Sequence, residues 1–293
     1  MYADAHCDTL TRAYDENCSL YKNKLHLDFD RLKDQECSLQ FMAIWTEPQY
    51  TSDQAFDRCL KVLDFYYSQI NDDINTVLAA DGISDDKLNV LLSVEGGDLL
   101  DGKIERLYKL YDLGIRAMTL TWNGDNCIGG GIGNNDKGLT DFGKEVVTEM
   151  NRLGMIVDVS HLSEKAFWQV ADMCEHFVAS HSNCRKLCKH LRNLTDQQIK
   201  CIIDHNGFIG LNFYSDFLNE KGATVNDIVR HAKHILDFDG EKVIGIGSDF
   251  DGMEKLPQNI VGVENMTEIL YEFCKKDMLY GNLYRNIQQI LKN

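Results

Sequence analysis

Short apolar stretches recur along almost the whole chain, and segments with helical periodicity separate them. Eight of the stretches predict β-strands, near Tyr2–Asp8, Ser38–Trp45, Val90–Glu95, Ile115–Thr121, Met155–Ser160, Phe177–His181, Gly207–Phe213 and Val243–Asp249. The second, fifth and seventh stretches are apolar at consecutive positions. Such runs are typical of parallel strands that are covered on both faces.

The segments between the strands predict amphipathic helices. The range Asp53–Ala80 places four apolar side chains at a spacing of three or four residues, namely Phe56, Leu60, Leu63 and Tyr67. Thr140 begins a helix that runs to Leu153, and Gly154 suits the position just after its end. Thr195 begins another helix and has a glutamine in the capping-box position.

Eight strands that alternate with helices predict an α/β fold, a (β/α)8 TIM barrel formed as a single domain by residues 1–293. A doubly wound open sheet is the alternative. The sequence has no evident linker, internal repeat or low-complexity segment. The glycine-rich piece Cys127–Gly133 lacks the Lys-Ser/Thr pair of a phosphate loop, and we interpret it as a mobile loop over a site.

Composition narrows the class of protein. Of the 293 residues, 44% are hydrophobic, which is ample for a large core, and the net charge of −16 disfavours nucleic acids and anionic membranes as partners. The ten cysteines are scattered, and we see no secretory leader and no apolar run long enough to span a membrane. We therefore expect reduced thiols in a cytoplasmic protein. Cys184 and Cys188, near His181 and His190, leave a separate zinc site as a minor alternative.

Residues that bind metals recur where the predicted strands end. Five of the eight strand ends carry such residues, and together these supply His6, Asp8, Glu95, Asp158, His161, His181 and Asp249. In a barrel these ends open on one face, where barrel enzymes keep their sites. In a strand, His6 and Asp8 also point to the same side, because side chains alternate between faces. We therefore expect three histidines and three carboxylates to converge on one cavity.

The number of donors favours two metal ions. His6, Asp8, Glu95, His161 and His181 are five nitrogen or oxygen donors without a thiolate, whereas one divalent ion with an open position needs three. Five donors suit two ions that share a bridging carboxylate, and Glu95 is the best bridge because its strand lies between the other ligand strands.

Two further carboxylates remain beside these five donors. Asp249 is left free to move a proton to a leaving amine. We expect Asp4, on the same face as His6, to support the site rather than to bind metal.

Each of these residues also has a structural alternative. His161 could cap the next helix, His181 could hydrogen-bond in a polar loop, and Glu95 could be a turn residue before two glycines. Asp249 and Asp251 could form a turn within Asp-Phe-Asp-Gly. We interpret the remaining histidines as structural: His26, His176, His190, His205, His231 and His234.

Six short strings follow one another along nearly the whole chain. They are Asp4-Ala5-His6-Cys7-Asp8, Ser93-Val94-Glu95-Gly96-Gly97, Asp158-Val159-Ser160-His161, Ser180-His181-Ser182, Arg192-Asn193 and Ser248-Asp249-Phe250-Asp251-Gly252. In this order the set resembles the membrane (renal) dipeptidase family, the M19 group of zinc metallopeptidases. The resemblance implies a (β/α)8 barrel with two zinc ions per chain and a homodimer. It also implies that His6 and Asp8 hold the first ion, that His161 and His181 hold the second, and that Glu95 bridges them.

The same resemblance implies how a small peptide substrate is handled. It implies that Asp249 protonates the departing amine and that Arg192 grips the substrate's C-terminal carboxylate. A guanidinium fork suits that contact, although Arg192 could also form a surface salt bridge or a contact at the entry to the next helix. The chain departs from the family at Trp122, where a histidine that contacts substrate is frequent, and Asn123 could substitute as a donor.

These observations predict a zinc dipeptidase that requires a free C-terminal carboxylate, with D-residues at the C-terminal position as an option. A hydrolase of the same metal chemistry that acts on another amide, ester or lactam is the first alternative. A metal-binding module without catalysis is the second, and five donors together with Asp249 argue against it. A scaffold without metal is the third.

Overall fold

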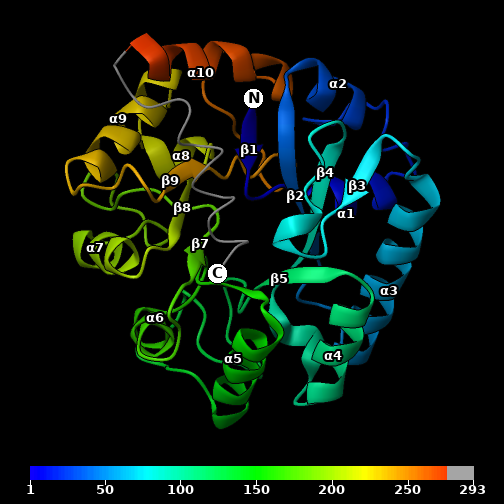
Figure 1. Cartoon of the computed structure of the whole chain (residues 1–293). Coiled ribbons are helices and arrows are strands. Elements are labelled where there is room, and N and C mark those ends of the chain that lie inside the picture. The colour runs from blue at the N-terminus through cyan, green and yellow to red at the C-terminus, as the bar shows by residue number, and fades with distance from the viewer. Residues whose placement is uncertain (276–293) are drawn as a thin grey trace.

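Eight parallel strands close into a barrel, and the helices that connect them form an outer ring (Figure 1). The structure is a computed structural model, and it describes residues 1–275. The barrel strands are β1 (Tyr2–Asp4), β2 (Cys37–Trp45), β4 (Leu88–Glu95), β5 (Ile115–Thr119), β6 (Ile156–Asp158), β7 (Val178–Ala179), β8 (Phe208–Leu211) and β9 (Ile244–Ile246). The ring is closed because β1 pairs with both β2 and β9, and β2 pairs with β4. The predicted TIM barrel is confirmed, and the open sheet is wrong.

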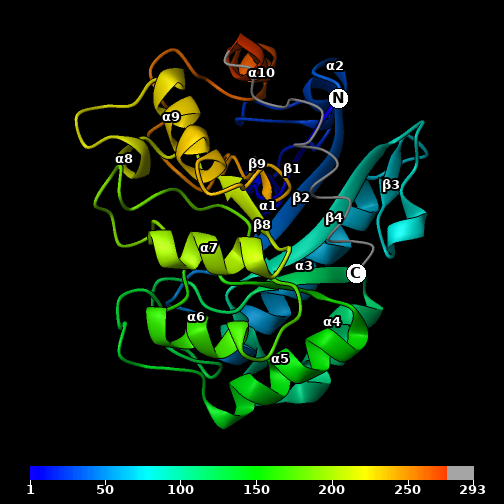
Figure 2. The same ribbon diagram turned by 60° about the vertical axis from the view of Figure 1, so that its left-hand side comes forward.

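A ninth strand, β3 (Ile74–Thr76), lies outside the barrel and pairs with the first residues of β4 (Figure 2). We predicted helix through Ala80, but α3 (Ser52–Gln69) ends earlier. After it, the Asn71 side chain accepts a hydrogen bond from the N–H of Asp73 (2.9 Å). Asparagine and aspartate compete with helices through such local bonds, so this part of the prediction is wrong.

The other helices begin in different ways, and only some of them begin at capping residues that the sequence signals. They are α1 (Thr9–Asp15), α2 (Phe29–Asp34), α4 (Ile104–Asp112), α5 (Asp141–Leu153), α6 (Glu164–Ala171), α7 (Asp196–Asp204), α8 (Ser215–Leu218), α9 (Val225–Leu236) and α10 (Met266–Lys275), with 3-10 turns η1 (Ala80–Gly82), η2 (Gly97–Leu100) and η3 (Val263–Asn265). Thr140 caps α5 by accepting from the N–H of Gly143 (2.9 Å), and Gly154 ends it with a left-handed φ of 68°. Thr195 and Gln198 form the capping box of α7. Each such cap contributes about 1 kcal/mol.

Apolar side chains fill one end of the barrel interior. The inner cluster consists of Ala3, Ala5, Leu39, Phe41, Val77, Leu91, Ala117, Ile156, Val178 and Phe208. A larger cluster lies between the barrel and its helices, and it takes the alternate residues of β2, such as Met42 and Ile44. The strands are therefore covered on both faces, as predicted. Because the interior is filled, the polar residues that end the strands collect at the opposite mouth.

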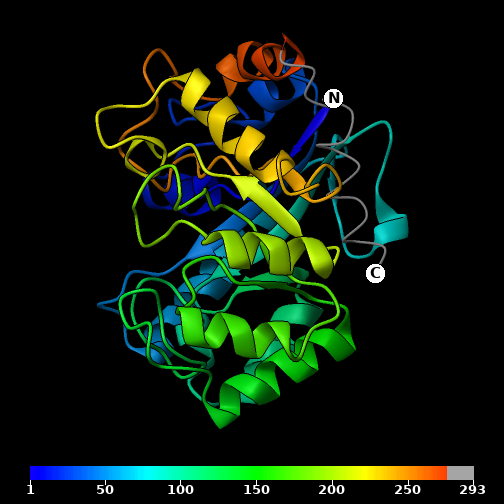
Figure 3. The ribbon, with the colours of Figure 1, turned by 90° about the vertical axis from the view of Figure 1, so that its left-hand side faces the viewer.

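The loops that follow the strands gather on one side of the molecule, the left in Figure 3. The glycine-rich segment Cys127–Gly133 differs from our expectation, because it packs against the backbone of His161 instead of covering a cavity. The N–H of Ile132 donates to the carbonyl of His161 (2.7 Å). A Cβ at Gly131 would lie 2.3 Å from the carbonyl oxygen of Gly124, so only glycine permits this close packing.

Two further expectations concern membranes and thiols. Within residues 1–275, none of the helices is both long and apolar enough to cross a membrane. Nine of the ten cysteines are free thiols, namely Cys7, Cys18, Cys37, Cys59, Cys127, Cys174, Cys184, Cys188 and Cys201. Cys184 and Cys188 donate to the carbonyls of His231 (3.4 Å) and Asp216 (3.3 Å), and the described residues form no metal-binding group around them. Among the described residues, the alternative of a separate zinc site therefore lacks a set of three donors.

Candidate metal centre

A cavity of about 810 Å³ opens at the barrel mouth where the strands end. Its wall includes four of the residues singled out from the strand ends, Asp8, Glu95, His161 and Asp249. These four side chains are buried, as are His6 and His181. The fold therefore brings three histidines and three carboxylates of the strand ends together at one mouth of the barrel.

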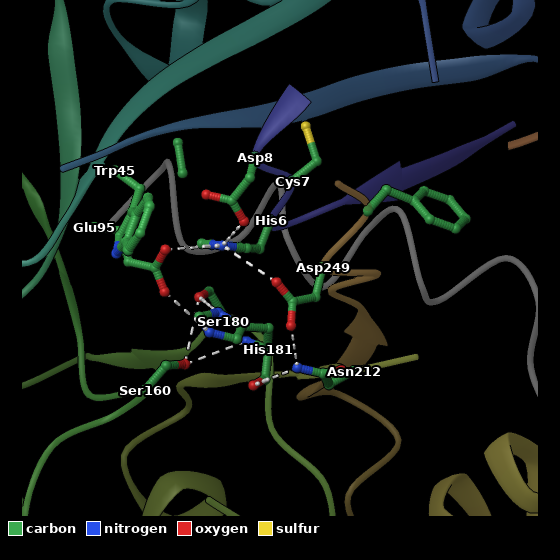
Figure 4. Close-up of polar contacts among 12 residues, drawn as sticks. His6, Cys7, Asp8, Trp45, Glu95, Ser160, Ser180, His181, Asn212 and Asp249 are labelled. Carbon is green, nitrogen blue, oxygen red and sulfur yellow. Dashed lines mark hydrogen bonds and ion pairs between the residues drawn. The ribbon is translucent and has the colours of Figure 1, made fainter. Parts of the chain in front are cut away.

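Glu95 lies between two groups of histidines. Its Oε2 is 3.8 Å from Nε2 of His6, and its Oε1 is 3.0 Å from Nε2 of His161 and 3.5 Å from Nε2 of His181. Figure 4 shows its carboxylate facing His6 with one oxygen and His181 with the other. One carboxylate therefore has a separate oxygen for each side of the cavity, which is the arrangement that a bridging ligand requires.

The first side of the centre is made by the end of β1 and the turn after β9. Nε2 of His6 lies 3.3 Å from Oδ2 of Asp8 and 3.8 Å from Oδ1 of Asp249. Asp4 accepts from the N–H of His6 (3.2 Å) and of Ser248 (2.9 Å), and so joins the two segments. Asp4 therefore supports the site through the backbone, as we expected.

The second side is made by the loops after β6 and β7. The Nε2 atoms of His161 and His181 lie 2.9 Å apart. Nδ1 of His161 is 2.8 Å from Oδ1 of Asn123, which can only accept, so Nδ1 carries the proton. In the same way Ser180 donates to Asp158 (2.5 Å), so its oxygen accepts from Nδ1 of His181 (2.8 Å). Both Nε2 atoms therefore present lone pairs to the cavity.

Burial and charge shift the pKa values on the two sides in opposite directions. Burial and the charge of Arg192 lower the pKa of His161 well below its usual value, and burial does the same for His181. Burial alone would lower the pKa of His6, but the carboxylates around it outweigh burial and raise this pKa to about 10. Burial also raises the pKa of Glu95, with Asp8 as the next cause.

This donor set fits divalent metal ions. Two lone pairs that face each other across 2.9 Å, together with a buried carboxylate, are stabilised by a cation between them. On the other side, Oδ1 of Asp8 is buried without a hydrogen-bond partner, so it is free to bind an ion. Imidazole and carboxylate donors without a thiolate are ligands that zinc accepts. The structural alternatives fail for His161 in particular, because Ser163 caps the next helix.

Arg192 is buried beside the centre, with 6% of its surface exposed. Its Nη2 donates to the carbonyl of His181 (3.2 Å), and its guanidinium lies over the ring of Phe217 (5.6 Å), which lines the cavity. Its Nε has no hydrogen-bond partner. Burial lowers the pKa of Arg192 to about 10, against the pull of the Asp249 and Glu95 carboxylates.

Trp122 and Asn123, in the loop after β5, lie at the edge of the centre. The ring of Trp122 stacks on His161 (6.2 Å between centroids) and contacts Trp45 (5.4 Å). Asn123 lines the cavity, but its side-chain oxygen is engaged by His161. A substrate contact from either residue stays a prediction.

A family model described as membrane dipeptidase (Peptidase family M19) matches residues 1–293. The chain belongs to this family. A dipeptidase of Schizosaccharomyces pombe, described as uncharacterised, is 33% identical over an alignment of 279 residues that covers 85% of this chain. Dipeptidase 3 of Mus musculus is 29% identical over an alignment of 283 residues that covers 90% of this chain. The chain spans 66% of the length of the first relative and 57% of the second.

Solved structures of similar proteins cover the chain almost completely. The crystal structure of dipeptidase AC, a metallopeptidase of family M19, has a TM-score of 0.91 and 26% identity, with 99% of this chain and 97% of that chain covered. A metallopeptidase of Rhodobacter sphaeroides, crystallised with a phosphinate mimic of the dipeptide L-Ala-D-Ala, gives the same TM-score and identity, with 99% and 98% covered. The barrel of this chain is therefore the barrel of M19 metallopeptidases.

Other residues support the site, and the sequence analysis assigned none of them an individual role, although it named Asp158 among the residues at the strand ends. Asp158 ends β6 and accepts from four groups, the side chains of Thr119 (2.6 Å) and Ser180 (2.5 Å) and the N–H groups of Ser160 and Ser180 (both 2.9 Å). Asn212 donates to Asp249 (2.9 Å). A signal for Asp158 was present, since it stands with His161 in one of the six strings.

Proposed function

We propose that this chain is a metal-dependent dipeptidase with two zinc ions per chain. The observation that carries the proposal is the position of Glu95, with one oxygen toward His6 and the other toward His161 and His181. Membership of the M19 family and the two M19-like metallopeptidase structures support the reaction class.

The ligands divide between the two sides of the cavity. His6 and Asp8 would hold one ion, His161 and His181 the other, and Glu95 both. Bound ions would polarise the scissile carbonyl and supply a nucleophilic water at neutral pH. The chain's own side chains hold these ligands in place. The inner apolar cluster fills the other end of the barrel and excludes water from that side of the site.

Asp249 is the residue that we propose to move the proton. It lines the cavity, its Oδ1 lies 3.8 Å from Nε2 of His6, and Asn212 fixes its other oxygen (2.9 Å). A carboxylate held at that position can take a proton from the attacking water and deliver it to the departing amine.

We propose that Arg192 binds the free carboxylate of the substrate. It carries a partnerless Nε and lies beside the cavity-lining ring of Phe217. The Rhodobacter sphaeroides relative binds a mimic of L-Ala-D-Ala, which supports a dipeptide with a D-residue at the C-terminal position as a substrate.

The test compares each dipeptide with its C-terminal amide. Loss of a charge-assisted bidentate contact costs on the order of 1.5–3 kcal/mol per strong hydrogen bond, so Arg192→Ala should lower kcat/KM for dipeptides by at least about tenfold. The amide has no carboxylate to lose, and its kcat/KM should change much less. Equal losses for both substrates would mean that Arg192 has only a structural role.

Arg116→Ala is the matched control. Arg116 also donates to backbone carbonyls, those of Leu78 (2.7 Å) and Tyr111 (2.6 Å), and lies over the ring of Tyr111 (3.9 Å), but it belongs to the start of β5, away from the site. It should leave the ratio of dipeptide to amide cleavage unchanged.

A panel of N-acyl amino acids, esters and lactams separates the dipeptidase from a hydrolase of another substrate. Cleavage of one of these without cleavage of any dipeptide would overturn the proposal. The homodimer and the cytoplasmic location stay predictions, which light scattering of the purified protein and cell fractionation test.

A further inference from the structure

The turn after β9 is joined to the first metal-binding segment by three successive contacts. The N–H of Asp249 donates to the carbonyl of His6 (3.1 Å), and the N–H of Asp8 donates to the carbonyl of Phe250 (2.8 Å). The third contact is between side chains, because the hydroxyl of Thr9 donates to Oδ2 of Asp251. Thr9 and Asp251 are 242 residues apart in the sequence, so this contact joins two distant segments of the chain.

Asp251 also binds the loop that precedes α2. Its Oδ1 accepts from the N–H of His26 (2.8 Å), and its own N–H donates to Nδ1 of His26 (2.9 Å). The side chain of Asp251 is 4% exposed, and its φ of 68° is a conformation that aspartate seldom adopts. Asp251 is therefore held by three hydrogen bonds with two residues, Thr9 and His26, which an ordinary turn residue would not make.

Gly252 shows how closely the turn approaches the chemistry. A Cβ on this residue would lie 2.2 Å from Oδ2 of Asp8 and 2.5 Å from Oδ1 of Asp249. The backbone of Gly252 therefore rests against both carboxylates at once. A displacement of the turn that carries Asp251 and Gly252 must change the spacing of Asp8 and Asp249.

We propose that Asp251 is a positioning residue that sets the distance between Asp8 and Asp249 by clamping the turn Asp249–Gly252 to Thr9 and His26. This inference rests on the proposed roles of Asp8 as a ligand and Asp249 as the proton carrier. It gives the second aspartate of Asp-Phe-Asp-Gly a function, and it makes His26 part of the clamp.

The experiment compares Asp251→Ala, Asp251→Asn and Thr9→Val in the full chain. Residues that orient metal ligands contribute about 10–100-fold to metal affinity or activity, so Asp251→Ala should lower kcat by that factor. KM should stay within about threefold, because the substrate itself loses no contact. The visible spectrum of the cobalt-substituted protein should change, and chelator competition should show weaker binding at one of two sites.

Asp251→Asn is the conservative rescue. Its amide oxygen can accept from the N–H of His26, and its amide group can donate to the hydroxyl of Thr9. It should recover most of the lost kcat and the wild-type cobalt spectrum. If Asp251→Asn is as defective as Asp251→Ala, the proposal that hydrogen bonds form the clamp is overturned.

Asp227→Ala is the matched control for lost stability. Asp227 accepts from the N–H of Thr224 (2.9 Å) and from Asn219 (3.1 Å) at the start of α9, outside the barrel. It should lower the melting temperature without changing kcat or the cobalt spectrum. If Asp251→Ala behaves like Asp227→Ala, the clamp is only structural and the inference is overturned.

Two outcomes keep this inference separate from the proposed function. If the wild-type protein cleaves no dipeptide, the proposed function fails, while the cobalt spectrum and metal affinity still decide the clamp. If Asp251→Ala does not fold, Thr9→Val removes a single contact and decides in its place. An unchanged spectrum and kcat in Thr9→Val would then count against the clamp.

Discussion

The two sides of the metal centre hold their side chains by different means. On the side of β6 and β7, hydrogen bonds through Nδ1 fix the rings of His161 and His181 and leave Nε2 free. On the side of β1 and β9, backbone hydrogen bonds hold the segments in place, since the N–H of Asp8 donates to Phe250 and the N–H of Asp249 donates to His6.

The charges of the two sides also differ. The histidines near Arg192 have pKa values well below the usual one, so they are neutral ligands. At His6, burial lowers the pKa, but Glu95, Asp8 and Asp249 together raise it to about 10. The first side therefore carries excess negative charge that a cation relieves, and the second side offers neutral nitrogens with fixed tautomers. Glu95 is the group that belongs to both.

The strongest way to break this comparison is to remove the shared group. Glu95→Gln keeps the size of the side chain but removes its charge and one acceptor oxygen. It should lower the affinity for both metal ions by more than the roughly 100-fold that supporting residues contribute to metal affinity. Activity should be lost together with the ions. Metal analysis after dialysis should show a fall from two ions per chain. Retention of two ions per chain would contradict the bridge.

The next largest effect should come from Asp249→Asn. The amide can still accept from Asn212, so the fold and at least one metal ion should be kept. A proton carrier contributes about 10²–10⁴-fold, and kcat should fall by that factor. Steady-state kinetics at a measured metal content test this, and a near-normal kcat would rule out proton transfer by Asp249.

The sequence predicted which side chains meet on the two sides of the cavity, but few of the residues that support them. The side chains that meet stand at strand ends, and the strands are visible as apolar runs because burial leaves a local pattern. The strand containing His6 was predicted through Asp8 but ends at Asp4, although the expected common direction of His6 and Asp8 holds.

Supporting contacts depend on how distant segments meet when the barrel closes. Thr9 and Asp251 are 242 positions apart, and Thr119 of β5 contacts Asp158 of the neighbouring strand β6. No local pattern reports such pairs. For the same reason β3 was missed, since its three residues are defined by pairing with β4 and not by a run of their own.

A smaller effect, confined to the second side, should follow from Asp158→Asn. An amide cannot accept at its nitrogen, so it loses bonds from the groups that now converge on one carboxylate oxygen, including that of Ser180. His181 should then be less well oriented, and metal affinity or activity should fall about 10–100-fold. Stepwise metal titration should show one weakened site while the site of His6 and Asp8 keeps its affinity. Equal weakening of both sites would show that the two sides are not independent.

The smallest effect should come from Asn123, and its two roles can be separated. If Asn123 serves mainly to fix the proton on Nδ1 of His161, Asn123→Ala should weaken metal binding about tenfold, the lower end of the range for such partners. Asn123→Asp keeps an acceptor oxygen at this position and should retain the affinity. If Asn123 instead donates to substrate, both variants should raise KM at unchanged metal affinity, because neither leaves an amide N–H. Metal titration and KM measured on the same two variants therefore decide whether Asn123 orients His161 or contacts the substrate.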